Sequence, residues 1–164
     1  MTYSRKTGKT SENWIEENRP ENGLFRAYWY NYTGDDPGEP TLDPDEGDGL
    51  RYEWYYKDGK RANGKSRGWW PNGQIKQVRT YKNGTYHGPW IEWHINGQKK
   101  KEVMFNNKLR DGLWTGWHKN GQKGYEGTYK NHKKVGLWTV WNENGTKKKE
   151  EIYDENGEMT EKIV

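Results

Sequence analysis

The stretch GLWTGWHKNGQKGYEGTY, residues 112–129, decides the fold because the chain repeats its pattern. Its Asn-Gly pair recurs every 24 residues. Each copy has a Trp three residues upstream, a Gly eight upstream and an aromatic residue nine downstream. The four Asn-Gly pairs begin at Asn72, Asn96, Asn120 and Asn144. A fixed period of this length indicates an array of one supersecondary unit.

The Asn-Gly pairs predict the turns of β-hairpins. A type I′ turn needs positive φ at both central positions, which Asn and Gly tolerate best. A second turn signal lies between successive units and brings a reversal every 11 to 13 residues. These second signals are Asp58-Gly59, Asn83-Gly84, Asn107-Lys108, Asn131-His132 and Asn156-Gly157. The expected fold is all-β: an elongated antiparallel meander of 24-residue β-hairpin repeats.

A two-residue loop at Asn96-Gly97 sets the register of its hairpin. Trp93 then faces Lys100, and Phe105 faces Gly88. The equivalent pairs are Trp69 with Lys76, Trp117 with Gly124, Trp141 with Lys148, Gly64 with Tyr81, Gly112 with Tyr129, and Gly136 with Tyr153. We therefore expect a ring over a glycine in every unit, and a lysine or glycine opposite the Trp nearest the turn.

The last three units carry a second Trp, at Trp90, Trp114 and Trp138, where the first unit has Ser66. Two Trp residues three positions apart point to opposite faces of an unbroken strand, so either both faces carry rings or a bulge intervenes. We favour one ring-rich concave face with a bulge or sharp bend at the leading Gly. Because Ser66 breaks the ladder, a binding face is expected over the last three units.

Residues 1–50 fit the repeat poorly, and we interpret them as an acidic N-terminal cap with degenerate repeats and an exposed loop at Gly34–Gly49. The expected turns and strands of these units are Asn22-Gly23, Trp29–Tyr32, Asp48-Gly49 and Tyr52–Tyr56. The array proper is assigned to residues 51–164. Its last expected strand ends at Tyr153 and is followed by a charged tail suited to blunting an open edge.

Composition supports a thin aromatic architecture. The 164 residues include eleven Trp and twelve Tyr, which can build an apolar layer where aliphatic residues are scarce. Charge is divided unevenly, with a net charge of −6 over residues 1–50 and +10 over residues 51–164. Neither a signal peptide nor an apolar run of the roughly 20 residues needed to span a bilayer is readable. We expect a cytoplasmic protein.

The residue types argue against an enzyme and against any cofactor. There is no Cys, no phosphate-binding glycine loop and no serine elbow. His94 and His118 share a repeat position and would lie about 10 Å apart, too far for one metal ion. Glu102, Glu126 and Glu150 recur identically, whereas catalytic carboxylates need different environments. These glutamates are expected to pair with Lys or Arg across the strands.

The unit Gly-x-Trp-x-x-Trp-x-x-Asn-Gly-Gln-x-x-x-Glu-x-x-Tyr resembles the variant MORN repeat of bacterial and phage proteins, including the YwqK-like group described as antitoxins. The resemblance covers residues 64–153. It implies a meander of β-hairpins that binds something, commonly another protein, inside a bacterial cell or a phage-infected host.

The function we expect is therefore a non-enzymatic scaffold for a protein partner, antitoxin-like or immunity-like. Its anchors would be Trp90, Trp93, Trp114, Trp117, Trp138 and Trp141, since Trp is typical of interaction hot spots. One alternative is a binder of a nucleotide, nucleic acid, small anion or anionic lipid through Lys76, Lys100 and Lys148 beside the rings. A second alternative is a structural part of a phage particle or other assembly.

Overall fold

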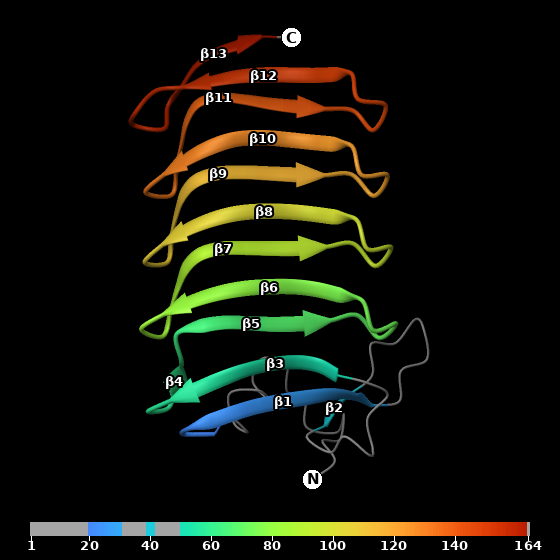
Figure 1. The fold of residues 1–164 in the computed structure, drawn as a ribbon. Coiled ribbons are helices and arrows are strands. Elements are labelled where there is room, and N and C mark those ends of the chain that lie inside the picture. The colour runs from blue at the N-terminus through green and yellow to red at the C-terminus, as the bar shows by residue number, and fades with distance from the viewer. Residues whose placement is uncertain (1–19, 31–38, 42–49, 164) are drawn as a thin grey trace.

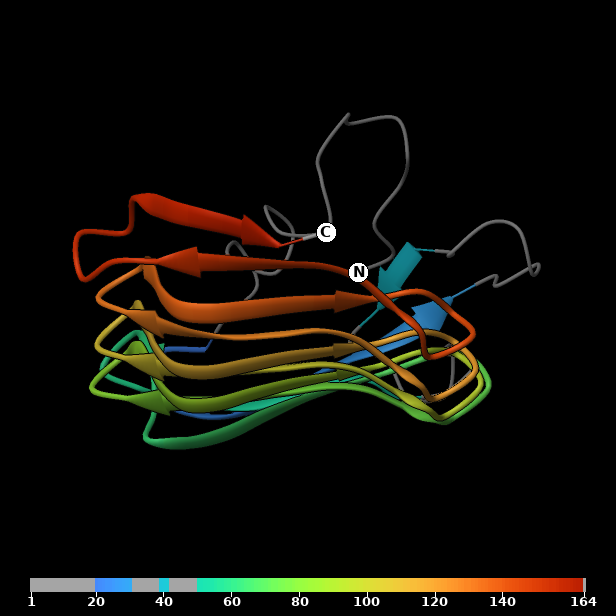
Figure 2. The same ribbon diagram turned by 90° about the horizontal axis from the view of Figure 1, so that it is seen from above.

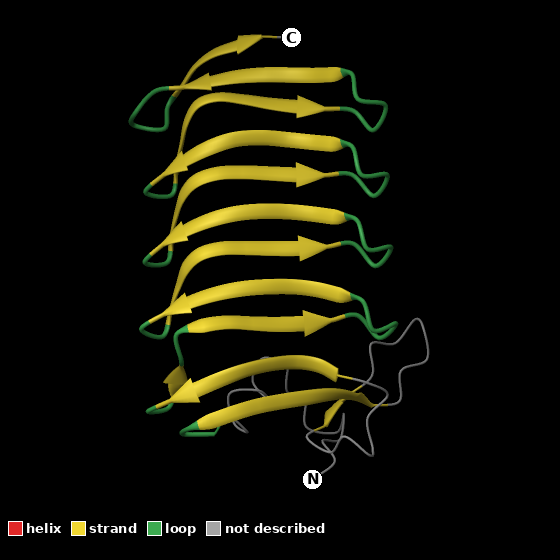
Figure 3. Cartoon of the chain, in the orientation of Figure 1, coloured by secondary structure: helices red, strands yellow, loops and turns green. Residues whose placement is uncertain are grey.

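The computed structural model describes residues 20–30, 39–41 and 50–163, and within them every element is a strand of one open antiparallel sheet (Figures 1 and 3). The array strands are β5 (Gly64–Trp69), β6 (Ile75–Lys82), β7 (Thr85–Trp93), β8 (Lys99–Asn106), β9 (Leu109–Trp117), β10 (Lys123–Lys130), β11 (Lys133–Trp141), β12 (Lys147–Tyr153) and β13 (Met159–Ile163). They are neighbours in chain order, so the elongated meander is confirmed.

Each unit is a hairpin whose outer register agrees with the prediction. In the second unit Gly88 lies opposite Phe105. The equivalent pairs are Gly64 with Tyr81, Gly112 with Tyr129, and Gly136 with Tyr153. The four ring-over-glycine pairs are therefore confirmed.

The type of the Asn-Gly turns was predicted wrongly. In the turn at Asn96-Gly97 only the glycine has positive φ, at 83°. Gly97 donates to the carbonyl of His94 (3.0 Å) and His94 donates to that of Gln98 (2.8 Å), as in a three-residue loop that ends in a glycine bulge. Positive φ at both central positions occurs instead at four of the intervening turns, as at Asn107 and Lys108, whereas Asn156-Gly157 follows the pattern of the repeat turns.

The extra loop residue moves the inner register by one position. Trp93 lies opposite Lys99 rather than Lys100, and the register shifts beside it. The same correction holds in the other units, where the partners are Trp69 with Ile75, Trp117 with Lys123, and Trp141 with Lys147. Lys76, Gly124 and Lys148 are therefore not the cross-strand partners of these rings.

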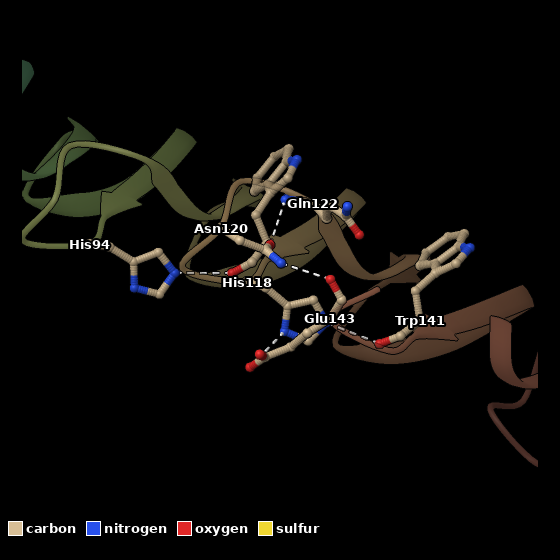
Figure 4. Close-up of polar contacts among 7 residues, drawn as sticks. His94, His118, Asn120, Gln122, Trp141 and Glu143 are labelled. Atoms are coloured by element: carbon tan, nitrogen blue, oxygen red, sulfur yellow. Dashed lines mark hydrogen bonds and ion pairs between the residues drawn. The ribbon is translucent and has the colours of Figure 1, made fainter. Parts of the chain in front are cut away.

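The Asn of the repeat turn joins its unit to the next one. Oδ1 of Asn120 accepts from the backbone N–H of Gln122 (3.0 Å), and Nδ2 donates to the carbonyl of Glu143 (2.7 Å) (Figure 4). Nε2 of His118 lies 3.0 Å from the carbonyl of Trp141, a contact that places the ring proton on Nε2. His94 makes the equivalent contact with Trp117. The Asn thus contributes its side-chain amide to the turn and to the next unit, and its backbone does not have the positive φ that was predicted.

The expected bend at the leading glycine is present. Gly88 has a φ of 92°, and the pairing of β6 with β7 shifts from Arg79–Trp90 to Tyr81–Tyr86 across it. Viewed along the stack, successive hairpins nearly overlie one another (Figure 2). Equivalent residues therefore form rows that run across the sheet.

The N-terminal part joins the same sheet through β1 (Gly23–Tyr30), β2 (Glu39–Thr41), β3 (Leu50–Lys57) and the short β4 (Lys60–Arg61). Gly23 faces Tyr56, and Phe25 faces Trp54, so β1 and β3 repeat the ring-over-glycine pattern. The strand expected at Trp29–Tyr32 begins earlier. Thr41 of β2 pairs with β1 inside the segment expected to be a loop. Asp48-Gly49 lies outside the described residues.

The charged tail after Tyr153 also differs from its expectation. It forms β13, which pairs with β12 through Ile152 and Glu161. The strand that ends at Tyr153 is therefore not the last of the sheet in the described part of the chain.

Candidate functional site

One face of the sheet, here called the ring face, collects the aromatic side chains. Trp90 stacks on Phe105 and on Tyr86, with ring centroids 5.6 and 5.4 Å apart. Trp138 packs edge to face against Trp114 at 6.1 Å and Tyr129 at 5.0 Å. Because neighbouring strands contribute interlocking rings, this face is the apolar layer of a thin molecule.

Cations lie on these rings in a repeating pattern. The guanidinium of Arg110 lies 4.7 Å from the centre of the Tyr129 ring and donates to its hydroxyl at 3.0 Å. The ammonium of Lys134 lies 4.9 Å from Tyr153 and donates to its hydroxyl. Arg61 and Tyr81 make the corresponding pair in the first unit.

The second unit departs from this pattern at both partners. Tyr86 stands where later units have Arg110 or Lys134, and Phe105 stands where they have a phenol. The two rings pack together with centroids 5.6 Å apart. The unit that lacks the cation therefore also lacks the hydroxyl that would accept from it.

An open groove of about 1250 Å³ lies on the ring face from β3 to β9. Its lining includes ten aromatic residues and nine Lys or Arg residues but a single carboxylate, Glu92. Lys101 pairs with Glu92 at 3.1 Å, and Arg67 pairs with Glu53 at 3.4 Å. Seven lining cations have no carboxylate partner among the described residues: Lys60, Arg61, Lys76, Arg79, Lys100, Lys108 and Arg110. The groove is therefore strongly cationic.

The opposite face, here called the back face, carries a lysine–glutamate pair in each of the last three units. Lys123 pairs with Glu126 at 2.8 Å and Lys147 with Glu150 at 2.7 Å, each along a single strand. Lys99 and Glu102 do the same. Cross-strand contacts come from Thr115 and Thr139, which donate to the glutamates of the next strand. The predicted cross-strand Lys or Arg partners of these glutamates are therefore wrong.

Burial changes the titration of the ring face. It raises the pKa of Tyr81 above its usual value, and the charges of Arg61 and Arg79 oppose this only in part. Burial also opposes the charge of Arg61, but the Tyr81 and Tyr56 phenols raise its pKa overall. Arg61 therefore remains charged while it is held between rings.

The predicted site residues divide into three groups. Trp90, Trp93 and Trp114 line the groove together with Lys76 and Lys100. Trp138 is buried, with 5% of its surface exposed, and acts as core. The remaining predicted residues, Trp117, Trp141 and Lys148, lie outside the groove.

Near the repeat turns a second set of rings meets lysines of the preceding unit. The ammonium of Lys99 lies 5.4 Å from the Trp117 ring, and that of Lys123 lies 5.4 Å from the Trp141 ring. These two contacts join successive units, whereas Lys101 on Trp90 and Lys76 on Trp70 are ring-on-lysine contacts within one unit, at 4.9 and 4.4 Å from the ring centres.

The groove runs over the first two units and the strands on either side of them, β3 and β9, rather than over the last three units. Sequence reasoning missed the four arginines that line it, Arg61, Arg67, Arg79 and Arg110. Arg79 had a readable signal, because it faces Ser66, whereas Trp90 of the next unit faces Val103. The residue at which the first unit departs from the repeat, Ser66 in place of Trp, lies in the lining of the groove.

The described residues contain no cluster of three or more His, Asp or Glu side chains suited to a metal ion. No helix long and apolar enough to cross a bilayer was found there either.

The sequence matches the family model of the MORN repeat variant in four segments, residues 62–83, 86–107, 110–131 and 134–154. These segments make up more than half of the chain. The chain belongs to the MORN repeat variant family. MORN repeats are generally non-enzymatic scaffolds that bind proteins or membrane lipids. No curated protein matches the sequence.

Proposed function

We propose that this MORN-repeat chain is a cytoplasmic scaffold that binds a protein partner in the ring-face groove. The observation that supports the proposal is the combination of ring anchors with seven cations that have no carboxylate partner among the described residues. Trp90, Trp93 and Trp114 supply the anchors, because partly exposed Trp beside Arg is typical of interaction hot spots. The cations select a partner with a negatively charged surface.

The resemblance to the antitoxin group gives this proposal its concrete form: an antitoxin-like or immunity-like protein that occludes the surface of its partner. A broad groove suits that role, since the ring face lies on the hydrogen-bonded sheet and offers a rigid surface across several strands. Rigid surfaces lose little conformational freedom on binding, so more of the contact energy appears as affinity.

The unpaired cations also favour a second candidate function, binding of a phosphorylated small molecule, nucleic acid or lipid headgroup. These ligands share the negative charge that the groove selects. They differ from a protein in how they are recovered, so one experiment separates the two functions.

The test is affinity capture with three matched forms of the chain, followed by mass spectrometry and by assays for nucleic acid and lipid. A groove variant carries Lys76→Gln, Arg79→Gln and Lys100→Gln. A back-face variant carries Lys99→Gln, Lys123→Gln and Lys147→Gln and loses the same number of positive charges. We expect one protein to be retained by the unmodified chain and the back-face variant and lost from the groove variant.

Two results would overturn the proposal. Recovery of nucleic acid or lipid alone would favour the second candidate. Retention of the protein by the groove variant would place its binding site elsewhere on the chain.

A further inference from the structure

The row of rings on the ring face is interrupted at Ser66. Trp90, Trp114 and Trp138 occupy this position in later units, and Ser66 occupies it in the first. On one side of the break Phe25, Trp54 and Tyr56 form a buried cluster. On the other side Tyr81, Tyr86, Trp90 and Phe105 form a second group of stacked rings. The Ser66 position, which lines the groove, therefore separates two aromatic clusters.

Two guanidinium groups lie at this break. Arg79 faces Ser66 across the hairpin, and its guanidinium lies 4.1 Å from the centre of the Trp90 ring. Arg61 lies between the two clusters, 4.8 Å from the Trp54 ring and 4.9 Å from the Tyr81 ring. Both line the groove, and Arg61 rests on Tyr81, which is two residues from Arg79 on β6.

Neither guanidinium has a carboxylate partner among the described residues. Arg79 donates to the Gln77 amide at 2.8 Å, and Arg61 donates to the Tyr81 hydroxyl. Both partners are neutral. Rings on which the cations rest hold them in place, so a carboxylate that enters meets guanidinium groups that are already oriented.

The shape and chemistry of the groove favour an extended polypeptide over a nucleotide. Six neighbouring strands at a spacing of about 4.8 Å span about 24 Å, the length of about seven residues of extended chain at about 3.3 Å each. Base stacking needs free ring faces. In the groove, however, Trp54, Trp70, Trp90 and Trp114 each carry a Lys or Arg over the ring.

We propose that the break at Ser66 is a pocket for one carboxylate side chain of an extended acidic segment of the partner protein, received between Arg61 and Arg79. This inference rests on the proposed protein-binding function and adds the chemistry of the segment that the groove recognises. The segment lies across β3 to β9, and its other acidic side chains meet Lys76, Lys100 and Arg110.

The experiment uses the full chain and a synthetic heptapeptide in which glutamates alternate with glycines, with titration calorimetry at low salt. We expect saturable binding that weakens as salt is added, because screening acts on exposed charge pairs. A peptide with glutamine in place of glutamate should bind at least about tenfold more weakly, since charge-assisted hydrogen bonds are lost. Arg79→Gln should cause a similar loss, and Lys147→Gln on the back face should cause none.

Ser66 allows a second test, whose main readout is the melting temperature of the chain without peptide. Ser66→Asp places a carboxylate in the pocket, and Ser66→Asn places a neutral group of the same size there. If the two guanidiniums form the pocket, the Asp variant melts at a higher temperature than the Asn variant at neutral pH, and it binds the peptide more weakly than Ser66→Ala does. An Asp variant that melts below the Asn variant would contradict the pocket.

Inorganic phosphate, ATP and single-stranded DNA serve as competitors. If any of them binds more tightly than the glutamate peptide and displaces it, the acidic-segment inference is overturned. No peptide binding, or binding that ignores Arg79→Gln, overturns it as well. Suppose that the peptide result overturns the inference but the groove variant still loses the captured protein: the proposed protein-binding function then stands. If the groove variant retains the captured protein as well, both the inference and the proposed function are wrong.

Discussion

The two faces of the sheet are made from the same strands but differ in what their charged side chains contact. On the ring face the cations rest on aromatic rings, and seven that line the groove have no carboxylate partner among the described residues. On the back face Lys123 and Lys147 are each paired with a glutamate, and Leu113 and Leu137 stand half exposed. One face holds both the apolar core and the groove cations, and on the other Lys99, Lys123 and Lys147 are each paired with a glutamate. In a single-layer protein, stability and recognition therefore share one face.

The largest effect expected from this difference comes from two adjacent residues that point to opposite faces. Trp138 is 5% exposed and packs on Trp114 and Tyr129, whereas Leu137 is 52% exposed. Trp138→Ala should lower the free energy of unfolding by about 3–5 kcal/mol, and Leu137→Ala by less than about 1 kcal/mol. Chemical denaturation of both variants measures the contrast, and equal losses would contradict the assignment of the core to one face.

A smaller effect is expected from a glycine beneath the rings. A Cβ at Gly127 would overlap the Trp138 indole, so Gly127→Ala forces the ring to move. The expected loss is about 1–3 kcal/mol, as for other overpacked cores. Thr128→Ala, at the next residue on the exposed back face, is the control and should change stability by less than about 0.5 kcal/mol. Similar denaturation midpoints for the two variants would show that the ring layer can accommodate the added methyl group without loss of stability.

Alkaline pH should weaken the ring face selectively. Burial raises the pKa of Tyr125 above its usual value. Because the folded chain holds this proton more tightly, the stabilisation is complete below the pKa of the unfolded state and is lost as the pH rises through the folded pKa. Tyr125→Phe should reduce the fall of the melting temperature above pH about 10. If the melting temperatures of the two proteins fall equally with rising pH, the raised pKa of Tyr125 is contradicted.

Acid should act on the back face, with the smallest effect. The hydrogen bond from Lys147, followed by that from Thr139, lowers the pKa of Glu150. The contribution of this group is present above its unfolded pKa and is lost as the pH falls through the lower folded pKa. Glu150→Gln should remove a small part of the acid dependence of the melting temperature. If the melting temperature of the variant falls with acid as much as that of the unmodified chain, the Lys147–Glu150 pair contributes nothing measurable to stability, which is common for surface ion pairs.

The repeating part of the fold was readable from the sequence because the fixed period places the turns. The pairing of Gly88 with Phe105 was predicted correctly because the register shift between Glu92 and Trp93 cancels the effect of the extra loop residue. The turn itself was misjudged, since Asn-Gly suits two kinds of hairpin loop. The contact from the Asn120 amide to the carbonyl of Glu143, which joins two units, has no local sequence signal either.

The candidate site was harder to predict because it depends on departures from the repeat. Ser66, read as a weak point of the ladder, lines the groove. Trp138, read as an anchor, is core. Which ring is covered depends on the residue that the next strand supplies, such as Arg79 over Trp90, and the repeat pattern alone does not contain that information.

At each repeat turn that is followed by another unit, the Asn amide makes the same hydrogen bond to that unit. Asn72, Asn96 and Asn120 each reach the backbone of the following unit in the same way. A whole unit spliced in or out between two others would leave equivalent joints on both sides, so the array can lengthen or shorten in steps of about 10 Å without a redesign of its surroundings. Duplication or loss of one repeat in the gene would therefore change the length of the array and leave the fold of the other units unchanged.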